Sequence, residues 1–213
     1  MVGTDTGVGK TSAVRSILDH LLSKGENATA IKPFVSGIQD GSWPDLDIID
    51  PNHLNHPPGR YQRPLSPYGA IRQGEKPVDR ADIREFLSSV EGRYERVIIE
   101  GIGALFVPLE KDWTWIDLHA EYGWPAILIG RSGLGTINHT CLSLEALAAR
   151  KIPCTGFVLC GVSCLEEENL EVAEENGAII HEMSGVPYLG HTPQNRSDPG
   201  SAWKNASLWR SMF

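Results

Sequence analysis

A glycine-rich loop near the start of the chain constrains its fold more than any other feature. Residues 3–11 read GTDTGVGKT and open directly into a helical pattern. The backbone N–H groups of such a loop and of the helix that follows bind anions. Lys10 adds a positive charge for the terminal phosphates, and the Thr11 hydroxyl can bind Mg²⁺. The loop therefore predicts a nucleoside triphosphate site at a turn between a strand and a helix.

The loop departs from the strict pattern G-x-x-x-x-G-K-[ST]. That pattern needs a glycine where this chain has Thr4, directly after Gly3. Only Met1 and Val2 precede the loop, whereas a strand usually spans about five or six residues. We therefore expect either a short first strand or a natural start upstream of Met1.

The rest of the chain alternates between strand-like and helical segments. Short apolar runs predict strands at 28–32, 96–100, 125–130 and 155–159. Apolar residues at helical spacing predict helices at 81–90, 137–149 and 11–24, the last ending at Gly25. Continuously apolar strands are buried on both faces, and their alternation with helices indicates a parallel sheet. The predicted class is α/β, a P-loop NTPase-like, mostly parallel sheet with helices on both faces, in a single domain over residues 1–213.

Two polar segments lie outside this alternation. Residues 51–66, where His, Asn, Pro and Gly cluster, predict a surface loop. The acidic run at 165–175 predicts a helix with a solvated face.

The composition excludes several classes of partner. The 213 residues include 27 Asp plus Glu against 19 Lys plus Arg, a formal net charge of -8, which argues against broad binding to nucleic acid or to an anionic membrane. No window reaches the roughly 18 to 20 apolar residues of a membrane span, and no signal-peptide pattern precedes the loop. We expect a cytoplasmic protein whose partners are small molecules.

The spacing of cysteine and histidine does not indicate a transition-metal site. The four cysteines lack CxxC spacing, which is typical of reduced thiols in an intracellular chain of this size. His53 and His56 lie in a proline-rich stretch with no third ligand nearby in the sequence. We assign no transition metal to the chain.

Charged side chains end two of the predicted strands, at the edge where open α/β sheets bind their ligands. Lys32 ends one strand and Glu100 another. A second lysine can stabilise charge that develops during phosphoryl transfer, and a carboxylate opposite a phosphate loop can bind Mg²⁺. A further carboxylate is expected from the segment WPDLDI, in which Asp45 and Asp47 are alternatives.

Taken together, these segments resemble the dethiobiotin synthetase family, ATP-dependent carboxylases that close the ureido ring in biotin synthesis. The resemblance covers nearly the whole chain in order. It rests on GTDTGVGKT at 3–11, KPFVSG at 32–37, EGIG with the following VPL at 100–109, GLGTINH at 133–139, and VPYLGHTP near the C-terminus. The first and fourth motifs are specific to the family when found together, and the others support them.

The resemblance implies a nucleotide site and a metal site. The residues implied for the nucleotide and its metal are Gly7, Val8, Gly9, Lys10, Thr11, Ser12, Asp47, Glu100, Gly101, Ile102, Gly103, Cys160, Gly161, Pro193 and Gln194. Mg²⁺ would be bound by Thr11, Asp47 and Glu100. Asp47 is preferred to Asp45 because the family has an acid followed by an apolar helix start.

The resemblance also implies catalytic and substrate-binding residues. Lys32 becomes the catalytic lysine, assisted by Lys10. The residues that would surround the diamine and its carbamate are Thr6, Lys10, Lys32 and Ser36. The residues that would meet the substrate carboxylate, across a homodimer interface, are Gly133, Leu134 and Asn138.

The implied reaction joins CO₂ to one amine of 7,8-diaminononanoate as a carbamate, which attacks the γ-phosphate of ATP. The second amine then displaces phosphate and closes the ring, so that no protein nucleophile is needed. Cys160 and Gly161 stand where the family usually presents Asn-Asp to the nucleotide base, and neither side chain offers an amide donor and acceptor. The nucleotide preference is therefore left open.

A P-loop switch ATPase of the partitioning or site-selection type is the alternative. Its loop resembles KGGVGKT, and alignment on the shared GKT places its signature lysine at Asp5. An acid cannot supply that positive charge. The loop therefore favours the resemblance to the dethiobiotin synthetases, which are ligases, over the switch ATPase.

Overall fold

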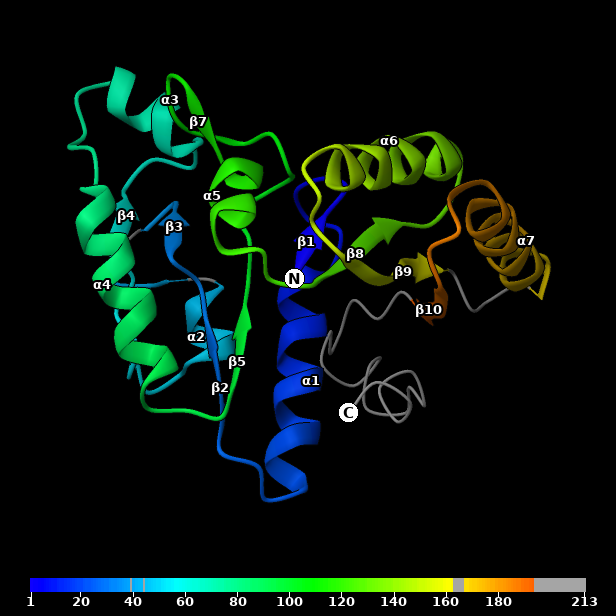
Figure 1. Ribbon diagram of the computed structural model, residues 1–213, viewed down its shortest axis with the longest axis horizontal. Helices are drawn as coiled ribbons and strands as arrows, with labels where there is room; N and C mark the ends of the chain where they lie inside the picture. Colours follow the sequence, from blue (N-terminus) through cyan, green and yellow to red (C-terminus); the bar gives the residue numbers. More distant parts are fainter. Residues whose placement is uncertain (39, 44, 163–166, 194–213) are drawn as a thin grey trace.

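The computed structural model of the chain describes residues 1–38, 40–43, 45–162 and 167–193. At its centre is a parallel sheet with the strand order β1-β8-β9-β10 (Figure 1). The bounds of these strands are β1 (Val2–Gly3), β8 (Ala126–Arg131), β9 (Cys154–Val162) and β10 (Tyr188–Pro193). A second parallel pair consists of β2 (Ala28–Ile31) and β5 (Arg96–Ile99).

Backbone hydrogen bonds place the end of β5 beside the start of β1. The Gly101 N–H donates to the Met1 carbonyl at 2.9 Å, and the Met1 ammonium donates to the Ile99 carbonyl at 2.7 Å. This pattern is that of parallel neighbours. The carboxyl ends of β1, β2 and β5 therefore meet at one edge of the sheet, where the phosphate loop also begins.

Helices pack on both faces of the sheet (Figure 1). The bounds of the longer ones are α1 (Lys10–Ser23), α4 (Arg80–Glu91), α5 (Trp115–Tyr122), α6 (Thr136–Ala149) and α7 (Glu167–Ser184). Alternate residues of the central strands belong to two hydrophobic cores. Leu128 and Phe157 belong to the core that includes residues of α4, α5 and α6. Ile129 and Val158 belong to the core that includes residues of α1 and the short α2 (Leu46–Ile49). Burial on both faces explains why these strands are apolar throughout.

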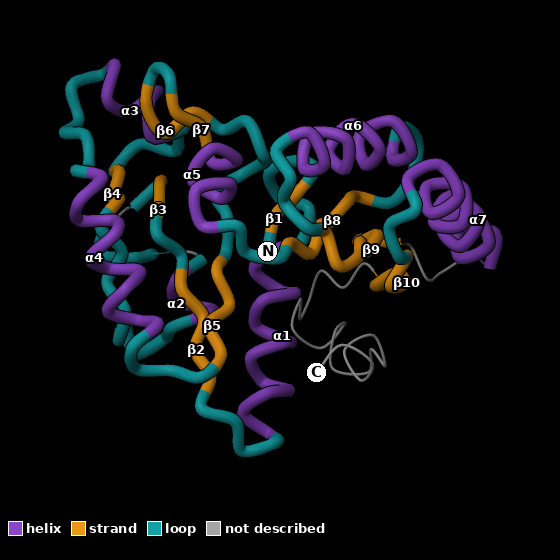
Figure 2. The backbone as a smooth tube through the Cα atoms, in the orientation of Figure 1, coloured by secondary structure: helices purple, strands orange, loops and turns teal. Residues whose placement is uncertain are grey.

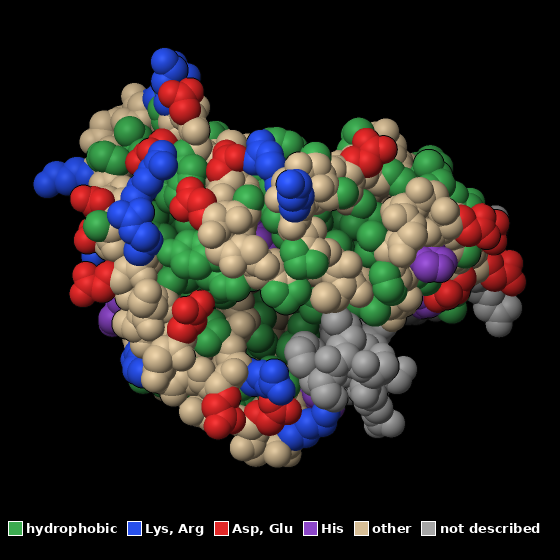
Figure 3. Space-filling view, in the orientation of Figure 1, with side chains coloured by type: hydrophobic (Ala, Val, Ile, Leu, Met, Phe, Trp, Pro, Cys, Tyr) green, Lys and Arg blue, Asp and Glu red, His purple; other side chains and the backbone are tan. Residues whose placement is uncertain are grey.

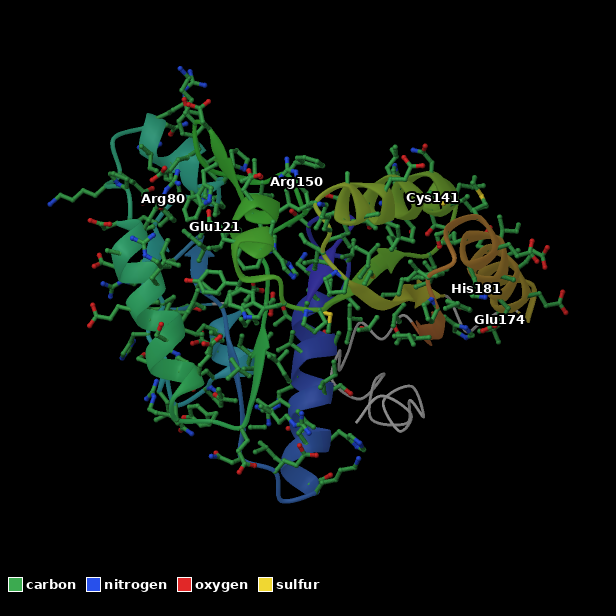
Figure 4. All side chains as sticks on the ribbon, viewed as in Figure 1. Arg80, Glu121, Cys141, Arg150, Glu174 and His181 are labelled. Atoms are coloured by element: carbon green, nitrogen blue, oxygen red, sulfur yellow. The ribbon has the colours of Figure 1, made fainter. Side chains whose placement is uncertain are left out.

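Short elements lie beyond β2, on the left of Figure 2. They are β3 (Phe34–Ser36), paired in parallel with β4 (Gly59–Tyr61), α3 (Pro67–Arg72), and β6 (Pro108–Glu110), paired antiparallel with β7 (Trp113–Thr114). Arg80 forms an ion pair with Glu110 at 2.7 Å and lies 4.2 Å from the centre of the Trp113 ring. The indole N–H of Trp113 donates to Glu121, which comes from α5 (Figure 4). These contacts attach the β6–β7 hairpin to α4 and α5.

The structure confirms the predicted α/β class and places strands and helices close to the predicted segments. Strand β1 spans Val2–Gly3, and a cavity of about 530 Å³ lies beside it, lined in part by Met1, Ile98 and Ile127. Gly25, which follows α1 as predicted, has a left-handed φ of 78°, the conformation in which glycine commonly ends a helix.

The prediction of an irregular loop over 51–66 is wrong at β4. A side chain at Gly59 would lie 2.3 Å from the Phe34 ring, so this glycine lets β4 approach β3. Of the predicted acidic helix at 165–175, residues 165 and 166 lie outside the described residues and the rest belongs to α7.

Three further observations concern the surface charges, the helices and the thiols. On the face shown in Figure 3, Lys and Arg side chains are interspersed with Asp and Glu. Within the described ranges, no helix is both long and apolar enough to cross a bilayer. The described cysteines Cys141, on α6 in Figure 4, Cys154 and Cys160 are free.

The packing around β9 predicts the effect of a core truncation. Phe157 has no exposed surface and lies 5.2 Å, centroid to centroid, from the Tyr188 ring. We expect Phe157→Ala to lower the free energy of unfolding by about 3–5 kcal/mol, because it removes buried surface and leaves a cavity. Urea unfolding of both proteins measures this change, and a loss below about 1 kcal/mol would contradict the described packing.

Candidate active site

The phosphate loop joins β1 to α1 through two glycines with left-handed backbones. Gly7 has a φ of 73°, and Gly9, the residue that caps α1, has a φ of 98°. Such φ values favour glycine. Helix α1 begins at Lys10, so its first N–H groups open toward the loop and form a site for an anion.

Lys10 folds back over this loop. Its Nζ donates to the Asp5 carbonyl at 3.0 Å, and a side chain at Gly3 would lie 2.9 Å from the same Nζ. Burial lowers the pKa of Lys10 to about 8, an effect that Glu100 opposes and Lys32 reinforces. A bound polyphosphate would place further negative charge beside Lys10 and so favour the charged form of its ammonium group.

A compact polar group lies beside Lys10, at the carboxyl ends of β2 and β5. The Lys32 ammonium donates to Glu100 Oε1 at 2.8 Å and also to the Asp45 carboxylate. The Thr11 hydroxyl donates to the same Glu100 oxygen at 2.8 Å and to Asp45 at 3.3 Å. The structure therefore brings together residues from the phosphate loop, two strand ends and the loop before α2.

Lys32 and Glu100 are both almost fully buried, with side-chain exposures of 5% and 1%. Burial by itself lowers the pKa of Lys32, but the carboxylates of Glu100 and Asp45 outweigh it, and the pKa lies above its ordinary value. Lys32 is therefore charged. A buried, paired ammonium of this kind can neutralise negative charge on a reacting group without reorganisation.

The oxygen atoms of this group fit a magnesium ion. Glu100 Oε2 is buried and has no hydrogen-bond partner among the described residues. Mg²⁺ prefers carboxylate and hydroxyl oxygens and usually takes only one or two protein carboxylates, with phosphates and water completing its shell. Thr11, Asp45 and Glu100 supply such a set. Among the described residues, no group of three or more His, Cys, Asp or Glu side chains is placed to hold a metal.

Asp47, the residue preferred from the resemblance, lies elsewhere. Its carboxylate accepts the Trp43 N–H at 2.9 Å and lies 2.6 Å from His53 Nε2. The Trp43 amide and His53 hold the pKa of Asp47 below its usual value. The two acids are separated by one residue, which rotates their side chains by about 200° around a helical turn. The structure therefore brings Asp45, and not Asp47, to Thr11 and Glu100.

The other residues expected near the phosphates lie around the same edge. Gly101–Gly103 follow Glu100 after the end of β5, and a side chain at Gly103 would lie 3.2 Å from Thr6 Oγ1. Ser36 ends β3, the strand that follows Lys32. Val8 is buried in the core of α1, and Ser12 belongs to the first turn of that helix.

The residues expected near the base and the substrate carboxylate are farther along the chain. Cys160 is buried. It lies against the phosphate loop, since a side chain at Gly9 would lie 3.4 Å from the Cys160 Cβ. Burial raises the pKa of the Cys160 thiol to about 12, so it is no thiolate. Gly161 has a φ of 84°, Pro193 ends β10, and Gln194 lies outside the described residues. The remaining three, Gly133, Leu134 and Asn138, lie exposed at the amino end of α6.

Comparison with known proteins identifies the family. Residues 1–198 match the family described as an AAA domain. The chain is 35% identical over 211 residues to the ATP-dependent dethiobiotin synthetase BioD of Thermodesulfovibrio yellowstonii, covering 91% of this chain and 87% of that protein. It is 33% identical over 199 residues to the biotin biosynthesis bifunctional protein BioCD of Bordetella avium, covering 91% of this chain but 39% of that longer protein.

Solved structures agree on the fold. The MinC:MinD cell division protein complex of Aquifex aeolicus is similar with a TM-score of 0.63 and 12% identity, covering 99% of this chain and 93% of that one. A likeness at this identity concerns the fold alone. The similarity in sequence to several dethiobiotin synthetases extends over most of each chain and shows that this chain belongs to the dethiobiotin synthetase family.

Proposed function

We propose that the chain catalyses the ATP- and Mg²⁺-dependent conversion of 7,8-diaminononanoate and CO₂ to dethiobiotin, ADP and phosphate. The observation that carries the proposal is the convergence of Lys10, Lys32, Thr11, Asp45 and Glu100 at one edge of the sheet. Family membership supports the same reaction, since the relatives are named for it.

The phosphate loop binds the triphosphate. The N–H groups at the start of α1 meet the phosphate oxygens, and Lys10, released from the Asp5 carbonyl, pairs with the terminal phosphates. When bound through Thr11, Asp45 and Glu100, Mg²⁺ supplies neutralisation of phosphate charge.

The chemistry proceeds by substrate groups alone. The lone pair of one amine attacks CO₂, a proton leaves the nitrogen, and a carbamate forms. A carbamate oxygen attacks the γ-phosphorus as the bond to ADP breaks, giving a carbamic–phosphoric mixed anhydride. The second amine attacks the carbonyl carbon, loses a proton and expels phosphate, which closes the five-membered ureido ring.

Lys32 acts on the charge that passes through these steps. The carbamate, the phosphoryl group in transfer and the leaving phosphate are all anionic, and a charged, buried Lys32 stabilises them. Thr6, which lies beside Gly103, and Ser36, at the end of β3, position the diamine.

A second copy of the chain completes the substrate site. Leu134 is fully exposed, with a relative exposure of 102%, and lies beside the exposed Gly133 and Asn138 at the amino end of α6. This helix end suits the substrate carboxylate, and burial against a partner subunit removes an apolar side chain from water. We propose that the enzyme acts as a homodimer and that it is located in the cytoplasm.

The base of the nucleotide has no amide side chain to read it at Cys160 and Gly161. The phosphates, by contrast, have a complete set of partners in the loop. We therefore expect CTP and GTP to support the reaction, with turnover within about tenfold of that with ATP, a difference of about 1.4 kcal/mol.

The assay that tests the function is phosphate release from ATP with Mg²⁺ and bicarbonate. We expect release to depend on 7,8-diaminononanoate. Equal release with and without the diamine would contradict the ligase and support the switch ATPase.

A further inference from the structure

The turn that carries Asp45 is held in place by a second acid. Asp45 is the residue before α2, and no hydrogen bond from its side chain caps the helix. Its carboxylate instead leaves the turn for Thr11 and Lys32. The direction of Asp45 therefore depends on Thr11 and Lys32 and on the position of the turn that carries it.

Asp47 connects the residues on either side of this turn, Trp43 before α2 and His53 after it. One carboxylate oxygen accepts the Trp43 N–H at 2.9 Å, and the other lies 2.6 Å from His53 Nε2. The Asp47 N–H in turn donates to the Trp43 carbonyl at 2.8 Å. Trp43 and Asp47 thus form a closed pair of hydrogen bonds with Asp45 between them, and His53 ties the chain after α2 to the same carboxylate.

The partners of Asp47 are themselves held. The rings of Trp43 and His53 pack with centroids 5.7 Å apart, and His56 lies 6.3 Å from each of them. His53 has a left-handed φ of 50°, a conformation that persists only where surrounding contacts impose it. The His53 N–H donates to the Asp50 carbonyl at 2.8 Å, which is one such contact.

We propose that Asp47 is a positioning residue, which holds the turn between Trp43 and His53 so that the Asp45 carboxylate faces Thr11 and Glu100. The two acids of the WPDLDI segment then have separate tasks. Asp45 binds the metal, and Asp47 orients the carboxylate of Asp45. This inference rests on the proposed function, because it takes Asp45 to be a metal ligand.

The first test measures metal binding without turnover. Mn²⁺ binding to the ADP-loaded protein is followed by electron paramagnetic resonance for the wild type, Asp47→Ala, Asp47→Asn and Asp45→Asn. We expect Asp47→Ala to weaken Mn²⁺ binding about 10- to 100-fold, as is usual for residues that orient a metal ligand. Asp47→Asn should recover much of this loss, because its amide oxygen still accepts the Trp43 N–H. Asp112→Ala, at an exposed acid between β6 and β7, is the matched control and should bind as the wild type does.

The second test separates positioning from ligation by the response of turnover to Mg²⁺. For Asp47→Ala, the Mg²⁺ concentration at half-maximal rate should rise about 10-fold or more, while kcat at saturating Mg²⁺ returns to within about twofold of the wild type. Asp45→Asn should lower kcat at every Mg²⁺ concentration. If Asp47→Ala does not fold, His53→Gln, which removes one partner of Asp47, should show the same shift in smaller degree.

The outcomes distinguish the two hypotheses. Wild-type Mn²⁺ binding by Asp47→Ala, or by His53→Gln in its place, would overturn the positioning role. A loss in Asp47→Ala that saturating Mg²⁺ does not restore, with normal binding by Asp45→Asn, would make Asp47 the ligand and also overturn it. A defect in both acids without any diamine-dependent phosphate release in the wild type would retain the positioning role and contradict the proposed function alone.

Discussion

Lys32→Ala should lower diamine-dependent turnover by about 10²- to 10³-fold, the usual effect of removing one fixed group that stabilises developing charge. The structure gives the physical reason. The Lys32 ammonium is buried and lies 2.8 Å from Glu100, at the edge of the sheet where the phosphate loop begins. Alanine removes this positive charge and leaves the carboxylates of Glu100 and Asp45, so the carbamate and the phosphoryl group in transfer lose one of the two lysine ammonium groups at this edge.

The same substitution should destabilise the empty protein. Removing one partner of a buried ion pair leaves the other charge uncompensated, at a cost of about 3–5 kcal/mol. Mg²⁺ with ADP should restore part of the lost melting temperature, because a bound cation supplies the charge that Glu100 then lacks. Thermal melts with and without Mg²⁺ and ADP measure this rescue. Near-normal turnover in a folded Lys32→Ala protein would remove Lys32 from the mechanism.

Glu100→Gln should have the second large effect, on the requirement for metal. Glu100 is 1% exposed, and in the part of the chain that the structure describes its Oε2 has no hydrogen-bond partner. Glutamine keeps the shape but replaces the charged ligand by a neutral amide. We expect the Mg²⁺ concentration at half-maximal rate to rise about 10- to 100-fold and turnover at saturating Mg²⁺ to fall about 10²-fold.

A titration of the rate against Mg²⁺ measures both effects of Glu100→Gln. Glu110→Gln is the matched control, because Glu110 forms an ion pair with Arg80 at a partly exposed position between β6 and α4. Exposed pairs contribute only about 0–1 kcal/mol, so this variant should keep the wild-type response. An unchanged Mg²⁺ requirement in Glu100→Gln would show that the metal is bound elsewhere.

The sequence predicted the ends of the central strands well, because there burial and chemistry coincide. Lys32 and Glu100 each follow a run of apolar residues, and the structure places the two in contact. Parallel neighbours bring their carboxyl ends to one edge, so the pairing follows once the class of fold is known. The phosphate loop was predictable for a similar reason, since its glycines and Lys10 are adjacent in sequence.

The choice between Asp45 and Asp47 could not be made in the same way. Both acids belong to one short helical turn, and their directions depend on contacts with Trp43 and His53 that no local pattern reveals. Similar reasoning applies to β3 and β4, which are three residues each and pair across a segment of more than twenty residues that includes α2. Segments this short carry too little periodicity to distinguish strand from loop.

The measurement that tests the proposed reaction most directly is the mass of the organic product formed from ¹³C-bicarbonate. The purified chain is incubated with ATP, Mg²⁺ and 7,8-diaminononanoate, and the product is compared with that from unlabelled bicarbonate. We expect dethiobiotin that carries a single ¹³C in the ureido carbonyl, in an amount equal to the phosphate released. Phosphate release without a labelled product would contradict carbamate formation in this site.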